Sequence, residues 1–211
     1  MFNKGINFTK KHIKENILLY SLVILCFLIG ISVGAFTVKI VDKHQKEQLV
    51  YYLKDFFQLF YNSELNNFDI LKQSFFNNFQ LITFNWILGA LIITFPLVLC
   101  IIGFKGFIIG FTAALLIEEF KFWGILLFLF GILPQNIIII SVFIVASVIS
   151  ISFAIEFIKT KLHKSKKVDF TKMFFLYSGI YGLFMVLILI SSSIEAYIAS
   201  KFIQLLVKGI L

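Results

Sequence analysis

The longest apolar stretch of the chain decides its fold: Phe122–Ile158, FWGILLFLFGILPQNIIIISVFIVASVISISFAIEFI, in which Glu156 carries the only charge. As one helix its 37 residues would measure roughly 55 Å, well beyond the roughly 30 Å hydrocarbon core of a bilayer. Proline lacks an amide donor and clashes with the preceding helical turn, and asparagine can cap a new helix. Pro134, Gln135 and Asn136 therefore predict a structural break inside this membrane segment.

Positive charge selects between the two topologies that such a break permits. A full crossing by residues 122–133 would place the following lysines outside the cell, against the tendency of lysine to stay in the cytoplasm. We therefore expect residues 122–133 to be re-entrant or interfacial from the outside, and residues 137–158 to cross fully inward. The lysines concerned are Lys159, Lys161, Lys164, Lys166 and Lys167.

The composition of the whole chain agrees with a membrane protein. Of the 211 residues, 60% are hydrophobic and 14% charged, and the mean hydropathy of +0.97 excludes a water-soluble globule. All nineteen basic residues are Lys, and they flank apolar segments, so we expect no nucleic-acid partner. The two Cys and three His lack ligand spacing, and no catalytic motif is present, so no metal, cofactor or enzymatic activity is expected.

Four further crossings follow from the remaining apolar runs. They are residues 17–38, 81–102, 106–120 and 174–194, which makes five crossings in a polytopic all-α helix bundle. We expect a tight turn at residues 103–106, with Lys105 marking the cytoplasmic face. Residues 195–211 form a short amphipathic tail on the outside.

The segment 42–80 is expected to lie outside, because its charges balance and positive charge does not retain it in the cytoplasm. Its apolar residues fall at helical spacing on either side of a polar interval, which predicts two amphipathic helices. Their aromatic face either rests on lipid headgroups or the bundle, or docks a partner protein. The candidate docking residues are Tyr52, Phe56, Phe60 and Phe75.

Small and acidic residues inside or beside the crossings leave further alternatives. Gly30 with Gly34, and Gly106 with Gly110, permit close helix packing, either within the chain or at the seam of a homo-oligomer. Glu118 and Glu119 are interpreted as a solvated helix end, because adjacent helical residues point about 100° apart and cannot act on one bond.

The polar residues at Pro134 also have two interpretations. A broken helix is typical of a transporter's substrate or gating site, but it equally forms a structural corner whose side chains satisfy the backbone. A transporter usually adds an ionisable residue at the same depth, and none stands within ten residues of Pro134. This favours the structural corner.

The order of elements and five local strings resemble the stage II sporulation protein M family, the engulfment membrane proteins of endospore-forming bacteria. The resemblance covers essentially the whole chain. Two of the strings are more specific than the others: the one at residues 133–136, and the one at residues 194–197, which contains the family-signature residues Glu195, Ala196 and Tyr197. The strings are Gln48-Leu49-Val50-Tyr51-Tyr52-Leu53, Asn85-Trp86-Ile87-Leu88-Gly89, Phe104-Lys105-Gly106, Leu133-Pro134-Gln135-Asn136 and Ile194-Glu195-Ala196-Tyr197.

This resemblance implies a non-enzymatic membrane scaffold in the mother-cell septal membrane during sporulation. Such a scaffold would recruit and regulate the cell-wall hydrolases stage II sporulation proteins D and P for peptidoglycan remodelling, with membrane lipid as its other partner. The main alternative is a transporter permease or gated channel component, because broader relatives are encoded beside transporter ATPases.

Overall fold

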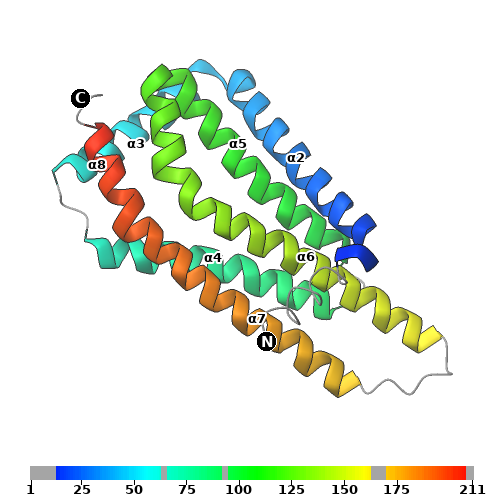
Figure 1. The fold of residues 1–211 in the computed structure, drawn as a ribbon. Helices are drawn as coiled ribbons and strands as arrows, with labels where there is room; N and C mark the ends of the chain where they lie inside the picture. The colour runs from blue at the N-terminus through cyan, green and yellow to red at the C-terminus, as the bar shows by residue number, and fades with distance from the viewer. Residues whose placement is uncertain (1–12, 63–65, 92–94, 163–169, 208–211) are drawn as a thin grey trace.

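The chain folds into a bundle of long helices, with no strand among the residues that the structure describes (Figure 1). The computed structural model describes residues 13–62, 66–91, 95–162 and 170–207. Two segments, η1 and η2, are π-helical. The elements are α2 (Ile17–Ile40), α3 (Lys43–Tyr61), α4 (Asn67–Ala90), α5 (Phe95–Leu126), η1 (Leu127–Ile132), α6 (Leu133–Leu162), α7 (Phe170–Ile194), η2 (Glu195–Ala199) and α8 (Ser200–Val207).

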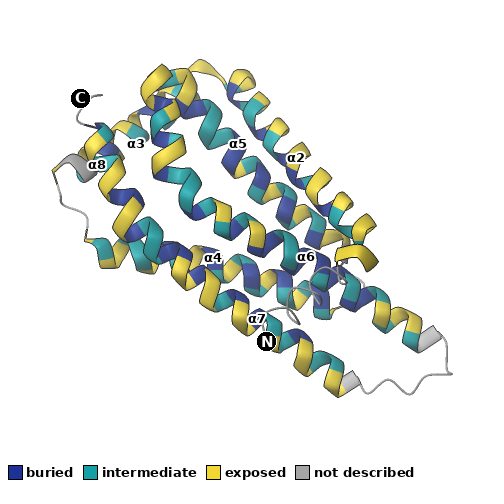
Figure 2. Cartoon of the chain, viewed as in Figure 1, coloured by how far each residue is buried: buried dark blue, intermediate teal, exposed yellow. Residues whose placement is uncertain are grey.

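The outer surface of the bundle is apolar. Leu18 is 82% exposed, Phe175 72% and Phe36 64%, and exposed residues line the outer faces of α2 and α7 (Figure 2). Exposing such an apolar surface to water is unfavourable, whereas contact with lipid is not. Three described stretches are long and apolar enough to cross a membrane: Ile17–Ile40, Pro96–Thr160 and Thr171–Val207. The predicted all-α membrane helix bundle is confirmed.

Glycines bring α2 and α5 into backbone contact. A Cβ atom on Gly34 would collide with the carbonyl oxygen of Phe107, and one on Gly110 with that of Ile31. Gly30 lies against Gly103 in the same way, so residue numbers rise together along the two helices and the pair is parallel. Small residues in membrane helices permit this close approach. Packing within the chain, one of the two interpretations of these glycines, is confirmed.

Contacts at the two ends of each helix fix the directions of the others. In α4, Gly89 lies against Tyr177 of α7, while Ser74 contacts Glu195 of η2, so α4 and α7 are antiparallel. Ser191 of α7 bonds to Gln135 of α6, and these helices are antiparallel as well. Consequently α2, α5 and α7 run in one direction and α4 and α6 in the other.

The buried face of α4 is largely polar. Ser74, Asn78, Ile82, Asn85 and Gly89 are buried at helical spacing, while phenylalanines on the other faces are exposed. This arrangement suits a helix that has lipid outside and polar partners inside. The predicted boundary differs here: residues 67–80 and 81–90 form one helix, so the expected second outer helix and the span 81–102 are not separate elements.

The chain reverses at Lys121 and not at residues 103–106. Residues 103–106 lie inside α5, whereas Lys121 has φ 52° and ψ −119°, outside helical geometry. Gly124 then packs on the Leu116 carbonyl, where a Cβ would collide, and the chain returns along the bundle (Figure 1). The expected turn at 103–106 is therefore corrected, and residues 122–133 begin the returning arm as helix.

The returning helix continues through Pro134. Leu133 donates its N–H to the carbonyl of Phe128, five residues earlier, and this π-helical spacing ends where α6 begins. A widened turn relieves the clash between a proline ring and the carbonyl four residues before it. Asn136 Nδ2 then donates to the Ile132 carbonyl at 2.8 Å. The expected break at Pro134, Gln135 and Asn136 is thus corrected to a change of helix type.

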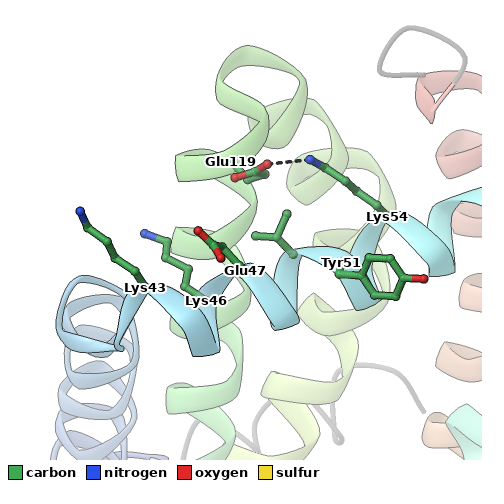
Figure 3. Close-up of a pocket in the computed structure, with 7 residues that line it drawn as sticks. Lys43, Lys46, Glu47, Tyr51, Lys54 and Glu119 are labelled. Atoms are coloured by element: carbon green, nitrogen blue, oxygen red, sulfur yellow. Dashed lines mark ion pairs between the residues drawn. The ribbon is translucent and has the colours of Figure 1, made fainter.

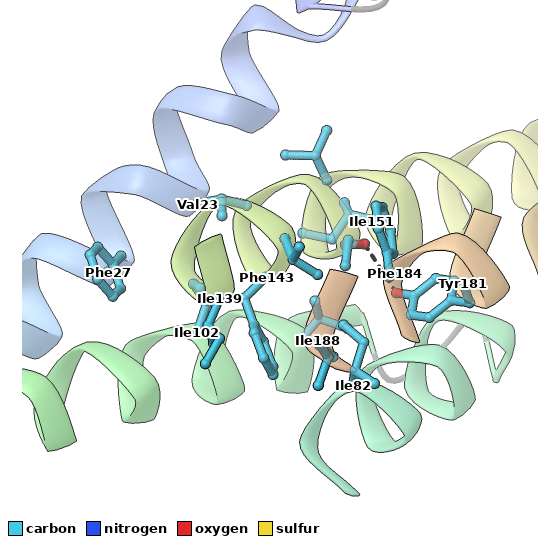
Figure 4. Close-up of a cluster of buried hydrophobic side chains, with 14 of the residues drawn as sticks. Val23, Phe27, Ile82, Ile102, Ile139, Phe143, Ile151, Tyr181, Phe184 and Ile188 are labelled. Atoms are coloured by element: carbon cyan, nitrogen blue, oxygen red, sulfur yellow. Dashed lines mark hydrogen bonds between the residues drawn. The ribbon is translucent and has the colours of Figure 1, made fainter. Parts of the chain in front are cut away.

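The apolar core lies where α2, α4, α5, α6 and α7 meet. Phe143 and Ile151 of α6 are the centre of this cluster, with Ile82, Ile102 and Ile188 around them (Figure 4). Tyr181 is also fully buried there, although it carries a hydroxyl group. The core is therefore apolar with polar groups embedded in it.

Candidate functional site

A cavity of about 430 Å³ lies between the two π-helical segments and the ends of α3, α4, α6 and α8. Wide π-helical turns interrupt regular side-chain packing and often occur at functional sites. Its walls combine apolar Ile132 and Ile203 with the polar Gln73, Gln135 and Glu195. A hollow that combines apolar walls with several polar side chains at this place is the candidate functional site.

Glu195, the first residue of η2, connects the cavity to the bundle interior. Its Oε2 accepts a hydrogen bond from the Ser74 hydroxyl of α4. Ser74 Oγ also lies 3.1 Å from Ser192 Oγ of α7. The carboxylate is attracted electrostatically to Lys105 of α5. Glu195 thereby connects the continuous α7–η2 segment to α4 and α5, which are distant from it in the sequence.

Lys105 lies inside the bundle, not at a cytoplasmic turn. Its Nζ donates to Asn78 Oδ1 of α4 at 2.9 Å and stands 5.7 Å from the centre of the Phe143 ring. An ammonium group among apolar helices requires such partners, because leaving it unpaired there is costly. The expectation that Lys105 marks the cytoplasmic face is corrected.

Gln135 is 6% exposed and lines the cavity. Its backbone carbonyl accepts a hydrogen bond from Ser191 Oγ at 2.8 Å. Its side-chain Oε1 is buried and has no hydrogen-bond partner among the described residues. Buried polar atoms are normally paired, so this oxygen is an available acceptor.

A second polar cluster lies deeper in the bundle and is fully paired. Asn85 Nδ2 donates to Ser147 Oγ at 2.9 Å, and Ser150 Oγ donates to Asn85 Oδ1 at 2.8 Å. The Tyr181 hydroxyl is 2.6 Å from Ser150 Oγ, and the Tyr177 hydroxyl donates to the Trp86 carbonyl at 2.8 Å. Because the groups satisfy one another, this cluster ties α4, α6 and α7 together and needs no ligand.

The helix α3 lies against the end of α5. Lys46 forms an ion pair with Glu118. Lys54 forms one with Glu119 at 2.9 Å, which is drawn in Figure 3. On the same side of α3, Phe57 packs with Phe120, their ring centres 5.6 Å apart. The two glutamates therefore hold α3 in place, in addition to ending a helical arm.

The structure separates the four candidate docking residues. Tyr52 is 69% exposed on α3, and Phe56 is 45% exposed and lines the cavity. Phe75 instead packs against the core cluster on α4. The side chain of Phe60 lies outside the described residues. Only Tyr52 and Phe56 are thus seen to present aromatic surface together.

The three family-signature residues also differ in their burial and position. Glu195 lines the cavity, Ala196 is fully buried, and Tyr197 is 48% exposed. Three of the five local strings contribute Lys105, Gln135 and Glu195 to the cavity and its electrostatic surroundings. Sequence reasoning missed Ser74 and Asn78, although polar residues four apart in an apolar helix were the available signal. Among the described residues, no three His, Cys, Asp or Glu gather as metal ligands.

Comparison with known proteins identifies the family. Residues 23–200 match the family model described as stage II sporulation protein M. Searches of curated proteins and of solved structures found no match. The matched range includes α3 to η2 in full, α2 from Val23 onward and only the first residue of α8, and it contains the cavity residues Gln135 and Glu195. The chain therefore belongs to the stage II sporulation protein M family and is a sporulation membrane protein.

Proposed function

We propose that the protein is a non-enzymatic membrane scaffold of the engulfment machinery, placed in the mother-cell septal membrane. It recruits and regulates peptidoglycan hydrolases there, stage II sporulation proteins D and P. Family membership supports a sporulation role. The observation that carries the scaffold role is the exposed aromatic face of α3.

This face is held in a fixed position. Val50 and Phe57 are buried on one side of α3, and the two ion pairs with Glu118 and Glu119 secure it further. Tyr51 and Tyr52 remain 70% and 69% exposed. Rigid aromatic side chains on a preorganised surface lose little entropy on binding and are common interface anchors.

The composition of α3 favours a protein partner over lipid. Lys43, Lys46, Glu47, Lys54 and Asp55 all belong to it, and α3 is not among the stretches apolar enough to cross a membrane. The balance of charge in residues 42–80 supports an outer location, where the hydrolases act on peptidoglycan.

A photo-crosslinking amino acid at Tyr52 tests the proposal in sporulating cells. We expect crosslinks to cell-wall hydrolases, and the same probe at Phe36, on the exposed face of α2, should capture none. Tyr52→Ser should lower hydrolase co-purification while the amount of the protein in the membrane stays normal. Normal hydrolase recovery with Tyr51→Ser and Tyr52→Ser combined would contradict docking at α3.

One observation favours the second candidate, a transporter permease or channel component. No ionisable residue stands near Pro134 in the sequence, but the fold brings Glu195 to the same cavity as Gln135, with Lys105 behind it. Paired charges inside membrane bundles mark ion pathways in many transporters. Recovery of an ATPase in place of hydrolases, in the same co-purification, would favour this candidate.

A further inference from the structure

The side chains that line the cavity between η1, η2 and α8 carry negative charge, whereas the protein as a whole is positively charged. The chain carries a formal net charge of +8, yet the described lining of the cavity includes the carboxylates Asp69 and Glu195 and no lysine or histidine. Lys105 offsets Glu195 from behind, whereas Asp69 is exposed and makes no ion pair with a described residue. The lining therefore favours a cation.

The buried Gln135 side chain supplies an independent indication. Its Oε1 is an acceptor without a partner among the described residues, and the residue is 6% exposed. A buried acceptor of this kind is stabilised by a donor that enters the cavity. Two carboxylates and a free carbonyl oxygen together select a group that donates several hydrogen bonds and carries positive charge.

The rest of the cavity fits an aliphatic stem. Ile70, Ile132 and Ile203 line it, and α8 approaches closely at Gly131, where a Cβ would stand 2.8 Å from Ile203 Cγ1. Lysine and arginine combine an apolar stem with a donor-rich cationic end. A small hydrophilic ion has no apolar surface to pack against these walls.

The cavity is also continuous with the proposed docking face. Phe56 lines it, and Phe56 stands one helical turn after Tyr52 on α3. A polypeptide lying on the aromatic face could therefore insert one side chain into the cavity. Both helices at this edge, α3 and α8, lie at the same end of the bundle and contact each other.

We propose that the cavity binds the lysine or arginine side chain of an extracytoplasmic segment of a partner protein. Asp69 and Glu195 attract the cation, Gln135 Oε1 accepts one of its hydrogen bonds, and the isoleucines contain its stem. The identity of the occupant as a partner protein rests on the proposed scaffold function; the cation selectivity of the cavity does not.

Charge selectivity is measured on the purified full chain by cysteine labelling. Ile203→Cys, made with Cys26→Ala and Cys100→Ala, places one thiol in the cavity, and Gln58→Cys on the exposed face of α3 is the matched reference. Rates are compared for trimethylammonioethyl and sulfonatoethyl methanethiosulfonate. Relative to Gln58→Cys, the cationic reagent should be favoured about fourfold for each unscreened carboxylate nearby.

Neutralising variants identify the source of this preference. Asp69→Asn and Glu195→Gln should each reduce the cationic preference, whereas Asp55→Asn, an equal charge change on α3 outside the cavity lining, should not. Because Glu195 also bonds to Ser74, the Asp69→Asn result stands even when Glu195→Gln fails to fold. The cation site would be overturned if the cationic reagent were favoured no more at Ile203→Cys than at Gln58→Cys. It would also be overturned if Asp69→Asn left the preference at Ile203→Cys unchanged.

Soluble side-chain analogues test the hydrogen bond. Millimolar Nα-acetyl-lysine methylamide should slow labelling of Ile203→Cys at least twofold, and the norleucine analogue, which lacks the ammonium group, should not. Gln135→Leu should abolish most of this protection. Equal protection by both analogues would show that only apolar contact operates and would overturn the proposal.

Two further labelling experiments identify the group that occupies the cavity. In membranes from sporulating cells, protection of Ile203→Cys that requires the hydrolases supports a partner side chain. Protection of the purified protein by phosphatidylethanolamine nanodiscs, absent with phosphatidylglycerol, would assign the cavity to a lipid amine and overturn the assignment. Failure of the Tyr52 crosslink together with retained cation selectivity would reject the scaffold function, yet leave the cation site standing.

Discussion

The Glu195 carboxylate accepts a hydrogen bond from the Ser74 hydroxyl, although 121 residues separate them in the sequence. The contact joins η2, which follows α7, to α4 and places a charge beside the buried polar face of α4. Lys105 bonds to Asn78, one turn after Ser74 on α4, and is attracted electrostatically to this carboxylate, so the fold contains a carboxylate and an ammonium group that balance each other.

We expect the Lys105 and Glu195 substitutions to be strongly coupled. Lys105→Met or Glu195→Gln alone leaves one charge without its counterpart inside the bundle, and each should destabilise the protein by about 1–3 kcal/mol. The double variant should recover part of that loss. Thermal unfolding of the detergent-purified protein measures the coupling. The exposed pair Lys54→Met with Glu119→Gln is the control, with coupling below about 1 kcal/mol; equal coupling in both pairs would contradict the buried arrangement.

Glycine-to-alanine substitutions should separate the effect of close packing between α2 and α5 from the effect of helix propensity. Gly34→Ala forces a Cβ into the Phe107 carbonyl and should lower the unfolding temperature and the yield of folded protein. Gly179→Ala is the matched control, because nothing lies within 4 Å of its Cβ position. It should be neutral or slightly stabilising, since alanine favours helix by up to about 1 kcal/mol. Equal loss from both variants would show that α2 and α5 are not in backbone contact.

The second polar cluster should be sensitive to the loss of one hydroxyl. Ser150→Ala removes a partner of Asn85 and Tyr181 within a buried network, at an expected cost of about 1–3 kcal/mol. Ser141→Ala is the control, because the exposed Ser141 bonds only to the backbone of its own helix. Unfolding temperatures measured in the same detergent give the comparison. An unchanged value for Ser150→Ala would mean that the network does not hold the helices together.

The side of the membrane on which α3 lies can be measured directly. In a chain lacking Cys26 and Cys100, Asn62→Cys at the end of α3 should react with an impermeant thiol reagent in intact cells. Lys159→Cys, near the end of α6, should react only after the membrane is permeabilised. The five crossings expected from the sequence require these residues on opposite sides of the membrane. Reaction of both in intact cells would reject that topology.

Sequence patterns predicted the ends of the most uniform helices well. Residues 17–38 and 174–194 lie within α2 and α7, because long uncharged runs between charged flanks have one satisfactory arrangement. The prediction was wrong where residues have two roles. The glycines and lysine at 103–106 are typical of a turn, but in the structure they pack against α2 and bond to Asn78.

The candidate site was less accessible to sequence reasoning. Gln135 and Glu195 were each singled out, but their meeting depends on the continuous helical return of the chain after Lys121, which the sequence indicated only as a re-entrant or interfacial segment at residues 122–133. Pro134 is a helix breaker in water, whereas a π-helical turn accommodates it within the bundle. The docking residue Phe75 was assigned to an outer helix because the continuity of α4 was not apparent from its mixed composition.

The polar face of α4 has a consequence for biosynthesis. This helix is not among the stretches apolar enough to enter a bilayer unaided, yet it contacts α6 and α7 along its length. When α4 leaves the ribosome, those partners have not been synthesised, and its serine and asparagines have nothing to bond to. We therefore expect stable integration of α4 to await the synthesis of α6 and α7, whereas α2 is apolar enough to cross the membrane without them.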